Sequence, residues 1–356
     1  MLADLKSRVA ALVDGKTILI TGAAGTIGRA LAQRLLEFKP TAVRLLDHNE
    51  EESFFLHLKH GKHENIRIFL GDIRDRERMK RALQDVQIVF HLAALKHVNV
   101  GEYNPFEVVR TNLVALQDMI ECSIDAGVER FLFTSSDKAV NPTSVMGGAK
   151  FIGERLVTAG NSYRGKAKIV FASTRFGNVL GSAGSVVPVF RRQILHQMPV
   201  TVTHRRMTRF FMTLQESVDL VLAGAVSAHG GEVFVPKMHS IVLQDLAETM
   251  IDLLASGQRV EITEIGLRPG EKLYEELFSE PELPRCLETD RLFILLPDVV
   301  EGQFRAAGRD ASTLGAGDYP DSPRQATRLY SSKEMAPLDR ARLKQLLAAE
   351  LAHLAP

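Results

Sequence analysis

The chain has 356 residues, which is enough for one large or two modest domains with a sizeable core. Its 44 basic and 43 acidic residues leave a net charge of +1, which argues against a general nucleic-acid binder. No apolar run approaches the length of a membrane span, and the first residues lack the features of a signal peptide. The two cysteines make no disulfide framework. We therefore expect a cytoplasmic protein.

Apolar runs alternate with segments of helical spacing in the first half of the chain, after a short amphipathic helix expected within residues 1–16. The runs that we expect to be strands are Thr17–Thr21, Val43–Asp47, Ile66–Leu70, Ile88–His91, Phe131–Ser135 and Ile169–Ser173. The helical segments between them include Thr26–Phe38, Arg76–Leu83 and Pro105–Ala126. This alternation predicts an α/β fold with a Rossmann-like, doubly wound parallel sheet.

The pattern changes after Arg175, where glycines and Pro188 mark loops. Further on, we expect the helices Gln215–Ser227 and Leu243–Ala255, the strand Glu232–Pro236, an irregular segment from Gly302 to Pro323 and a last helix, Asp339–Leu354. These elements predict a second, smaller domain.

A glycine-rich segment lies between the first expected strand and the first long helix. Gly22, Gly25 and Gly28 permit a tight turn and a close approach of the backbone to a pyrophosphate, and the helix start offers free N–H groups. Asp47 ends the second strand, where a carboxylate can bind both ribose hydroxyls, and Asp72 follows the third strand, where it suits the adenine amino group. These features predict a dinucleotide site.

The cofactor that this site favours is NAD rather than NADP. Asp47 would repel the 2′-phosphate of NADP, and no arginine follows it directly, although His48 weakens the preference. We expect residues 1–175 and about 206–238 to form the NAD-binding domain, and about 176–205 and 239–356 to form the smaller α/β substrate domain.

An acid and a base, Asp137 and Lys138, directly follow the fifth expected strand, and Lys150 lies on the next expected helix. Ligands bind open α/β sheets at the carboxyl ends of strands, so we expect this pair in the active site. In nicotinamide-dependent enzymes, a lysine like Lys150 usually has a tyrosine four residues before it, where this chain has Met146. A thioether carries no proton, so either Asp137 and Lys138 perform the proton chemistry or the protein is no simple alcohol dehydrogenase.

Several ordered motifs occur between about Gly15 and Pro297. They are HLAALKHV (91–98), EYNP (102–105), SDKAVNP (136–142), RFGNVLGS (175–182), MTRFFMT (207–213), VPKM (235–238) and GLRPGEKL (266–273). With these motifs the chain resembles extended short-chain dehydrogenase/reductases, specifically the CapD-like nucleotide-sugar 4,6-dehydratases of bacterial polysaccharide synthesis. The resemblance implies a UDP-linked N-acetylhexosamine substrate, most often UDP-N-acetylglucosamine, and a homo-oligomer.

Two positions depart from the patterns of that family. Soluble members that invert C5 usually carry tyrosine at the position of Met146, whereas membrane-anchored members that mostly retain C5 often carry methionine. The chain therefore looks like the methionine type without a membrane part. Ser136 stands where many members have threonine, and its hydroxyl can form the same hydrogen bond.

The implied reaction oxidises C4 of the sugar, eliminates water across C5 and C6, and returns the hydride to C6. We predict Lys138 as the C5 base and Asp137 as the C6 acid, with burial pushing both pKa values in the required direction. Lys150 would favour neutral Lys138, oppose protonated Asp137 and hold the nicotinamide ribose. Ser135 and Ser136 would hydrogen-bond a sugar hydroxyl. Our hypothesis for the C4 hydroxyl proton is that Asp137 takes it.

The other candidates would contact the cofactor or the substrate. The expected cofactor contacts are Gly22, Ala24, Gly25, Thr26, Ile27, Gly28, Asp47, Asp72, Ile73, Ala93, Ala94, Lys96, Asn112 and Lys150. The expected substrate contacts are Lys96, His97, Asn178, Ser182, Arg209, Arg268 and Glu271. Arg209 and Arg268 would bind the diphosphate, the latter in a loop that enters a helix. The resemblance implies that Asn112 supports the active-site lysine through water and that Met146 packs near the sugar.

Two alternatives stay open. An epimerase or ketoreductase on the same fold needs no Asp–Lys pair and normally keeps the tyrosine, so Asp137, Lys138 and Met146 argue against it. The missing tyrosine favours a catalytically silent NAD-binding scaffold, which the retained Asp137, Lys138 and Lys150 oppose. The three histidines within residues 57–63 have no cysteine or well-placed acid beside them, so we expect no metal site.

Overall fold

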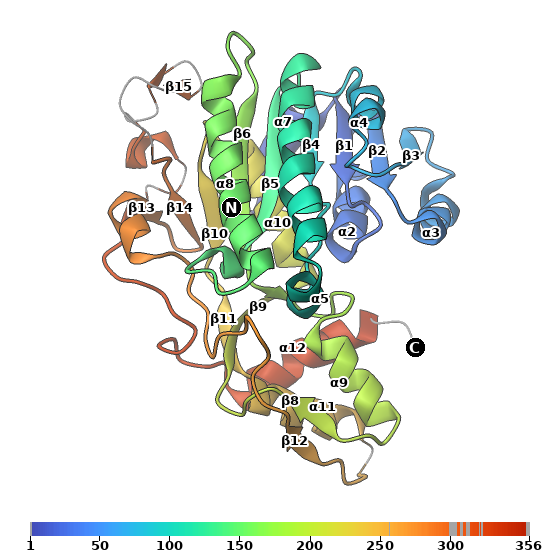
Figure 1. Cartoon of the computed structure of the whole chain (residues 1–356), viewed down its shortest axis with the longest axis vertical. Helices are drawn as coiled ribbons and strands as arrows, with labels where there is room; N and C mark the ends of the chain where they lie inside the picture. Colours follow the sequence, from blue (N-terminus) through green and yellow to red (C-terminus); the bar gives the residue numbers. More distant parts are fainter. Residues whose placement is uncertain are drawn as a thin grey trace.

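The computed structural model describes residues 2–255, 257–298, 305–306, 309–310, 314–319, 321 and 323–353. It confirms the α/β class, with helices on both faces of a ten-stranded sheet (Figure 1). The strand order in this sheet is β17-β13-β14-β10-β6-β5-β4-β1-β2-β3. The strands are β1 (Thr17–Thr21), β2 (Ala42–Asp47), β3 (Ile66–Leu70), β4 (Ile88–His91), β5 (Arg130–Ser136), β6 (Val170–Phe176), β10 (Val233–Pro236), β13 (Cys286–Glu288), β14 (Leu292–Leu295) and β17 (Arg324–Gln325).

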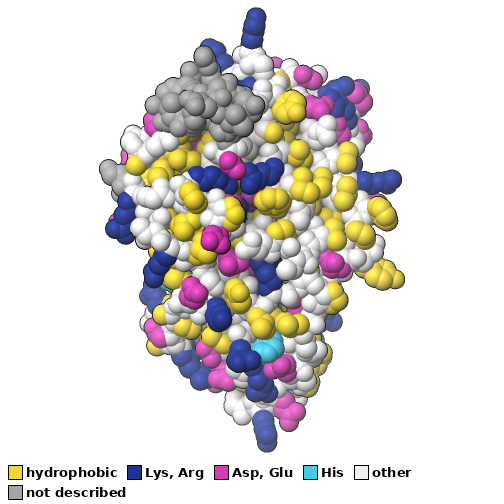
Figure 2. All heavy atoms as spheres, turned by 60° about the vertical axis from the view of Figure 1, so that its left-hand side comes forward, with side chains coloured by type: hydrophobic (Ala, Val, Ile, Leu, Met, Phe, Trp, Pro, Cys, Tyr) yellow, Lys and Arg dark blue, Asp and Glu magenta, His cyan; other side chains and the backbone are white. Residues whose placement is uncertain are grey.

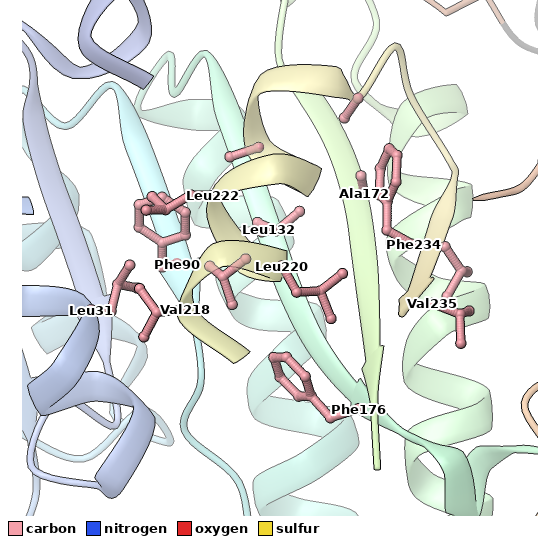
Figure 3. Close-up of a cluster of buried hydrophobic side chains, with 14 of the residues drawn as sticks. Leu31, Phe90, Leu132, Ala172, Phe176, Val218, Leu220, Leu222, Phe234 and Val235 are labelled. Carbon is pink, nitrogen blue, oxygen red and sulfur yellow. The ribbon is translucent and has the colours of Figure 1, made fainter. Parts of the chain in front are cut away.

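Alternate side chains of each buried strand face opposite sides of the sheet. On β1, Ile18 packs into one core and its neighbour Leu19 into the other. The helices that contribute to the first core are α1 (Leu2–Val13), α2 (Thr26–Leu35), α3 (Glu50–His60) and α10 (Leu214–Ser227), and those of the second are α4 (Arg76–Leu83), α7 (Ala115–Asp125) and α8 (Val145–Tyr163). Figure 3 shows Val218 and Leu222 of α10 beside Phe90 of β4 in the first core.

The crevice for a ligand follows from the strand order. β1 pairs in parallel with β2 on one side and with β4 on the other, so successive connections leave β1 in opposite directions along the sheet. At such a switch point the loops after the two strands diverge, and a cleft opens at their carboxyl ends. The glycine-rich turn follows β1 and the segment with Lys96 follows β4, so both border this cleft.

A smaller unit lies beyond the carboxyl ends of the parallel strands (Figure 1). It contains a sheet of β7 (Asn178–Val179), β9 (Thr208–Met212) and β11 (His239–Val242), a pair of β8 (Val200–Val202) and β12 (Ile262–Glu264), and the helices α9 (Val186–Leu195), α11 (Leu243–Leu254) and α12 (Arg340–His353). Phe190, Met250 and Leu343 belong to its own hydrophobic core. The remaining short strands, β15 (Arg305–Ala306) and β16 (Arg309–Asp310), pair with each other.

The strand pairing corrects two of the expected domain boundaries. β9 was expected in the NAD-binding domain, but it pairs with β7 and β11 of the smaller unit. β13, β14 and β17 were expected in the smaller unit, but they extend the main sheet, where β14 pairs antiparallel with β10. The apolar run Leu292–Leu295 covers an edge of the parallel sheet that would otherwise be open. Part of the segment expected to be irregular, residues 302–323, lies outside the described residues, and its described part contains the paired strands β15 and β16.

The expected helix Pro105–Ala126 is broken into α6 (Pro105–Val109), a π-helical turn (Arg110–Val114) and α7, and it follows a short helix, α5 (Val98–Tyr103). Such turns are frequent at functional sites, and this one carries the buried Asn112. Within the described part of the chain, no helix has both the length and the apolar character to cross a membrane. On the face in Figure 2, basic and acidic side chains are interspersed.

Candidate active site

The glycine-rich turn brings three backbone segments into close contact. Gly22 has φ +68°, and a Cβ atom there would lie 2.7 Å from the backbone nitrogen of Ala93. A Cβ atom at Gly28 would lie 2.5 Å from the carbonyl oxygen of Gly22. The first turn of α2 starts at Thr26, and Gly25 before it offers no capping side chain. The helix start can therefore receive an anion, as a dinucleotide pyrophosphate requires.

Two acids at the ends of β2 and β3 have different surroundings. Asp47 is buried; its Oδ2 accepts the Ala24 N–H at 3.0 Å, and its Oδ1 accepts the Asn49 N–H at 3.1 Å. Asp72 is bound by Arg74 at 2.6 Å, and these hydrogen bonds, against the effect of burial, lower the pKa of Asp72. Asp47 thus ties the glycine turn to β2, at the position where a ribose would lie. The turn, the free helix start and this carboxylate fit a dinucleotide.

Asn112 fixes the loop that follows β4. Its Oδ1 accepts the N–H of Leu95 at 2.8 Å, and its Nδ2 donates to the carbonyl oxygen of Leu95 at 2.9 Å. In the same loop, Lys96 Nζ donates to the Ala183 carbonyl at 2.6 Å, while the Ala183 N–H donates to Thr26 Oγ1 at 3.1 Å. The segment with Ala183 therefore links the loop after β4 to the start of α2. Water-mediated support of Lys150 by Asn112 stays a prediction.

The structure gives the surroundings of the other expected contact residues near this segment. Ile73 is buried, Ala93 and Ala94 are half-buried after β4, and Ser182 lies next to Ala183 in the linking segment. His97 precedes α5, and a Cβ atom at Gly184 would lie 2.5 Å from the His97 ring. Burial, and then the charge of Lys96, lowers the pKa of His97.

Asp137 and Lys138 form an ion pair at the end of β5. Asp137 is fully buried, and its Oδ1 accepts hydrogen bonds from Ser136 Oγ and Lys138 Nζ, both at 2.9 Å. Among the described residues, Asp137 Oδ2 and Ser135 Oγ are buried without a hydrogen-bond partner. Lys138 Nζ also lies 3.4 Å from Asn178 Oδ1. Burial of Asp137 Oδ2 and Ser135 Oγ without hydrogen-bond partners costs free energy, and a ligand that bonds to these atoms would recover it.

Helix α8 packs directly against the turn that carries Asp137 and Lys138. Ser144 caps this helix by accepting the Gly147 N–H at 3.1 Å, and a Cβ atom at Gly147 would collide with the Lys138 carbonyl oxygen. Met146 in the first turn is only 3% exposed. Lys150, one turn further on, donates to the Thr134 carbonyl oxygen at 2.7 Å, so it lies against the same strand.

Electrostatics distinguish the two lysines. Burial lowers the pKa of Lys150 to about 8, and the nearby Glu154 offsets part of that effect. Burial also lowers the pKa of Lys138, but Asp137 and Glu275 outweigh it, so that pKa is raised above the usual lysine value. Burial thus acts on the Lys138 pKa in the expected direction, but the net shift is the opposite of the one that a neutral amine requires. The reason is that two carboxylates stabilise the ammonium form.

A cavity of about 140 Å³ opens beside Lys138. Its lining residues are Val98, Lys138, Thr143, Ser144, Asn178, Arg209, Gly270, Glu271, Lys272 and Glu275. The structure thus brings the expected residues Lys138, Asn178, Arg209 and Glu271 together from four distant segments. Sequence reasoning missed Glu275, which follows the GLRPGEKL motif by two residues and has no local spacing that distinguishes it from its neighbour Glu276.

The two arginines expected at the diphosphate differ. Arg209 is buried at the cavity and donates to the carbonyl oxygens of Thr208 at 2.8 Å and Lys272 at 2.7 Å. Arg268 is exposed, and no helix begins within residues 269–279, so the expected loop-to-helix anion site is wrong. A turn at Gly270 with φ +78° redirects the chain instead, and Lys272 Nζ fastens it to the Val140 carbonyl at 2.8 Å. The described residues contain no group of three or more histidine, cysteine or acidic side chains that could hold a metal.

The family model described as "Polysaccharide biosynthesis protein" matches residues 18–297. The chain belongs to this family. The match includes the glycine turn, the Asp137–Lys138 pair and the cavity loop, which we define as residues 270–275. It confirms the predicted resemblance to CapD-like members of the extended short-chain dehydrogenase/reductases.

Curated relatives cover most of the chain. A protein of Methanocaldococcus jannaschii, named an uncharacterized membrane protein, is 48% identical over 81% of this chain and 87% of its own length. The UDP-N-acetylglucosamine 4,6-dehydratase (inverting) of Campylobacter jejuni is 37% identical over 81% of this chain and 85% of its own length. The UDP-glucose 4-epimerase of Rickettsia conorii is 36% identical over 76% and 80%. The chain thus has relatives named for two different reactions.

Solved structures share the fold. The structure of Pen from Bacillus thuringiensis matches with a TM-score of 0.85 and 37% identity, and the match covers 94% of this chain and 98% of that one. MoeE5, in complex with UDP-glucose and NAD, matches with a TM-score of 0.62 and 25% identity over 72% and 87% of the two chains.

Proposed function

We propose that this protein is an NAD-dependent nucleotide-sugar 4,6-dehydratase that converts UDP-N-acetylglucosamine to its 4-keto-6-deoxy derivative. The observation that carries the proposal is the ion pair between the buried Asp137 and the half-buried Lys138, with Oδ1 and Nζ 2.9 Å apart, beside a cavity at the carboxyl end of β5. An adjacent acid and base are what elimination of water across C5 and C6 requires. The Campylobacter jejuni dehydratase, 37% identical, supports the same reaction.

The chemistry that NAD would supply at this site is reversible hydride transfer, from C4 of the sugar and later back to C6. Ser135, with its unpartnered hydroxyl, would hydrogen-bond the sugar, and Lys150 would hold the nicotinamide ribose. The free Oδ2 of Asp137 would take the C4 hydroxyl proton, because no tyrosine stands at Met146. Once protonated, Asp137 can give that proton to the leaving C6 hydroxyl. It then also ceases to stabilise the ammonium form of Lys138, which favours the neutral amine that takes the C5 proton.

NAD is the cofactor we propose, since the Asp47 carboxylate lies where a 2′-phosphate would be repelled. We also propose a homo-oligomer. Large apolar side chains are exposed on adjoining helices of the NAD-binding part, which include Tyr103, Phe106, Phe151 and Ile152. Light scattering at several protein concentrations tests this, and a monomer throughout would refute it.

The test of the reaction uses UDP-N-acetylglucosamine deuterated at C4 and NMR of the sugar. The proposal predicts a 4-keto-6-deoxy product with deuterium at C6 and no net NADH, and the C5 couplings report retention or inversion. Asp137→Asn should abolish turnover, because an amide neither takes nor gives the proton. Deuterium that stays at C4 in an epimerised sugar would instead favour the epimerase reading, which the relative from Rickettsia conorii supports.

A further inference from the structure

Glu275 is the least exposed charged residue of the cavity loop, with 2% of its surface accessible. Its Oε1 lies 3.7 Å from Lys138 Nζ and 3.8 Å from Arg209 Nε, and its Oε2 lies 3.2 Å from Lys272 Nζ. Three cations thus surround one carboxylate. Oε2 has no hydrogen bond of good geometry within the described part of the chain, so the interaction is mainly electrostatic.

The position of Glu275 is set by the fold and not by its ion pairs. The Glu275 N–H donates to Ser332 Oγ at 3.0 Å, and Ser332 Oγ is 2.9 Å from Thr208 Oγ1. Arg209 is held independently, because its guanidinium donates to two backbone carbonyls. The carboxylate is therefore delivered to Lys138 by segments distant in sequence, and it would stay there if Asp137 lost its charge.

We propose that Glu275 is a positioning residue that keeps Lys138 basic enough to take the C5 proton after Asp137 has been neutralised. This inference rests on the proposed dehydration. In that step the C5–H bond breaks, its proton moves to the Lys138 amine, and the C5–C6 double bond forms. The C6–O bond breaks as Asp137 donates its proton to the C6 hydroxyl, which departs as water. Lys138 ends as an ammonium ion. Asp137 is neutral until it has donated its proton and is ionised afterwards, whereas Glu275 carries its negative charge throughout and stabilises the ammonium ion during the whole step.

The charged groups that face Lys138 predict the direction of the effect. Asp137 and Glu275 raise the pKa of Lys138, whereas Arg209 lowers it, and Asn178 contributes no charge. Removal of the charge in Glu275→Gln should lower the pKa of Lys138 by about one unit. The effect is no larger because Arg209 and Lys272 already offset part of the negative charge of Glu275. The side chain of Lys138 is 24% exposed and lines the cavity, which gives a small reagent a route to it.

The first experiment reads the pKa of Lys138 without requiring turnover. The folded full-length protein is labelled with acetic anhydride across a pH series, and acetylation of Lys138 is quantified by peptide mass spectrometry. Glu275→Gln should shift the titration of Lys138 about one unit lower, Glu275→Asp should restore most of the wild-type value, and Glu276→Gln should match wild type. Glu276 is the matched control, because its carboxylate accepts from Asn141 and no ion pair joins it to Lys138. An unshifted titration in a folded Glu275→Gln protein would overturn the inference.

The second experiment follows the pH dependence of dehydration. The alkaline-rising limb of kcat should move to lower pH in Glu275→Gln, and the plateau should fall because the amine is a weaker base. If the wild-type enzyme turns over but the alkaline-rising limb of kcat lies at the same pH in Glu275→Gln, the proposed role of Glu275 in elimination is wrong. Absence of wild-type turnover would count against the proposed dehydration alone, and the labelling would still decide whether Glu275 controls the charge on Lys138.

Discussion

Substitution of Gly147 tests how closely α8 must approach the Asp137–Lys138 turn. Helix propensity alone predicts that alanine at this helical position stabilises the protein by about 0.8–1 kcal/mol. The packing predicts the opposite, because the added Cβ atom would fall on the Lys138 carbonyl oxygen and lie 3.1 Å from Ser144 Oγ. Both neighbours are held in place, one by the turn and the other as the helix cap.

The neighbouring glycine provides the matched control. A Cβ atom at Gly148 would have no atom within 4 Å, so Gly148→Ala should keep the full propensity gain of about 1 kcal/mol. Overpacking of a buried contact typically costs about 1–3 kcal/mol, so Gly147→Ala should end near neutral or be destabilised by up to about 2 kcal/mol. It should also move the Lys138 backbone and lower turnover far more than stability, since catalysis is sensitive to small displacements.

The assay compares urea unfolding midpoints and turnover of the two variants with those of wild type. We expect Gly148→Ala to unfold at a higher urea concentration than wild type and Gly147→Ala at a lower one, with turnover reduced only in Gly147→Ala. Equal stabilisation in both variants, with unchanged turnover, would show that the contact between α8 and the Lys138 carbonyl does not constrain the site.

Two further predictions concern buried charge. Arg175 is 1% exposed and bridges Glu154 at 2.6 Å and Glu282 at 2.9 Å, so Arg175→Met should lose about 3–5 kcal/mol of unfolding free energy by leaving two buried carboxylates without a cation. Burial, and then the charge of Lys150, lowers the pKa of His91 to about 3 from the model-compound value of 6.5. The folded state therefore keeps His91 neutral while the unfolded chain takes up a proton, so the protein should lose about 2 kcal/mol between pH 6.5 and 5 through this residue. His91→Asn, which can still bond Thr21, should show a shallower acid dependence in urea titrations at each pH.

These two predictions have their own controls. Arg340→Met breaks an exposed pair with Asp252 and should cost less than about 1 kcal/mol. An Arg175→Met protein as stable as Arg340→Met would contradict the importance of the buried triad. For His91, parallel stability curves of wild type and variant from pH 7 to pH 5 would mean that this histidine does not account for acid sensitivity.

The limits of several strands of the main sheet could be predicted, because a strand's limits depend on residues that are adjacent in the sequence. Apolar runs bounded by turn residues located β1, β3 and β4 at their observed limits, and the glycine-rich turn was recognisable from its spacing. The antiparallel β14 was not recognised, since a four-residue apolar run carries no mark of the strand it will pair with. The same limit explains the wrong domain boundaries.

By itself the sequence determined the fold class, the glycine-rich turn and the family, because each depends on local periodicity or on ordered motifs. It also determined that Asp137 and Lys138 stand together, since they are adjacent along the chain. Only the tertiary structure brought a second carboxylate to Lys138. Glu275 lies 137 positions further along the chain but 3.7 Å away in space, and Coulomb interactions follow distance in space and not in sequence.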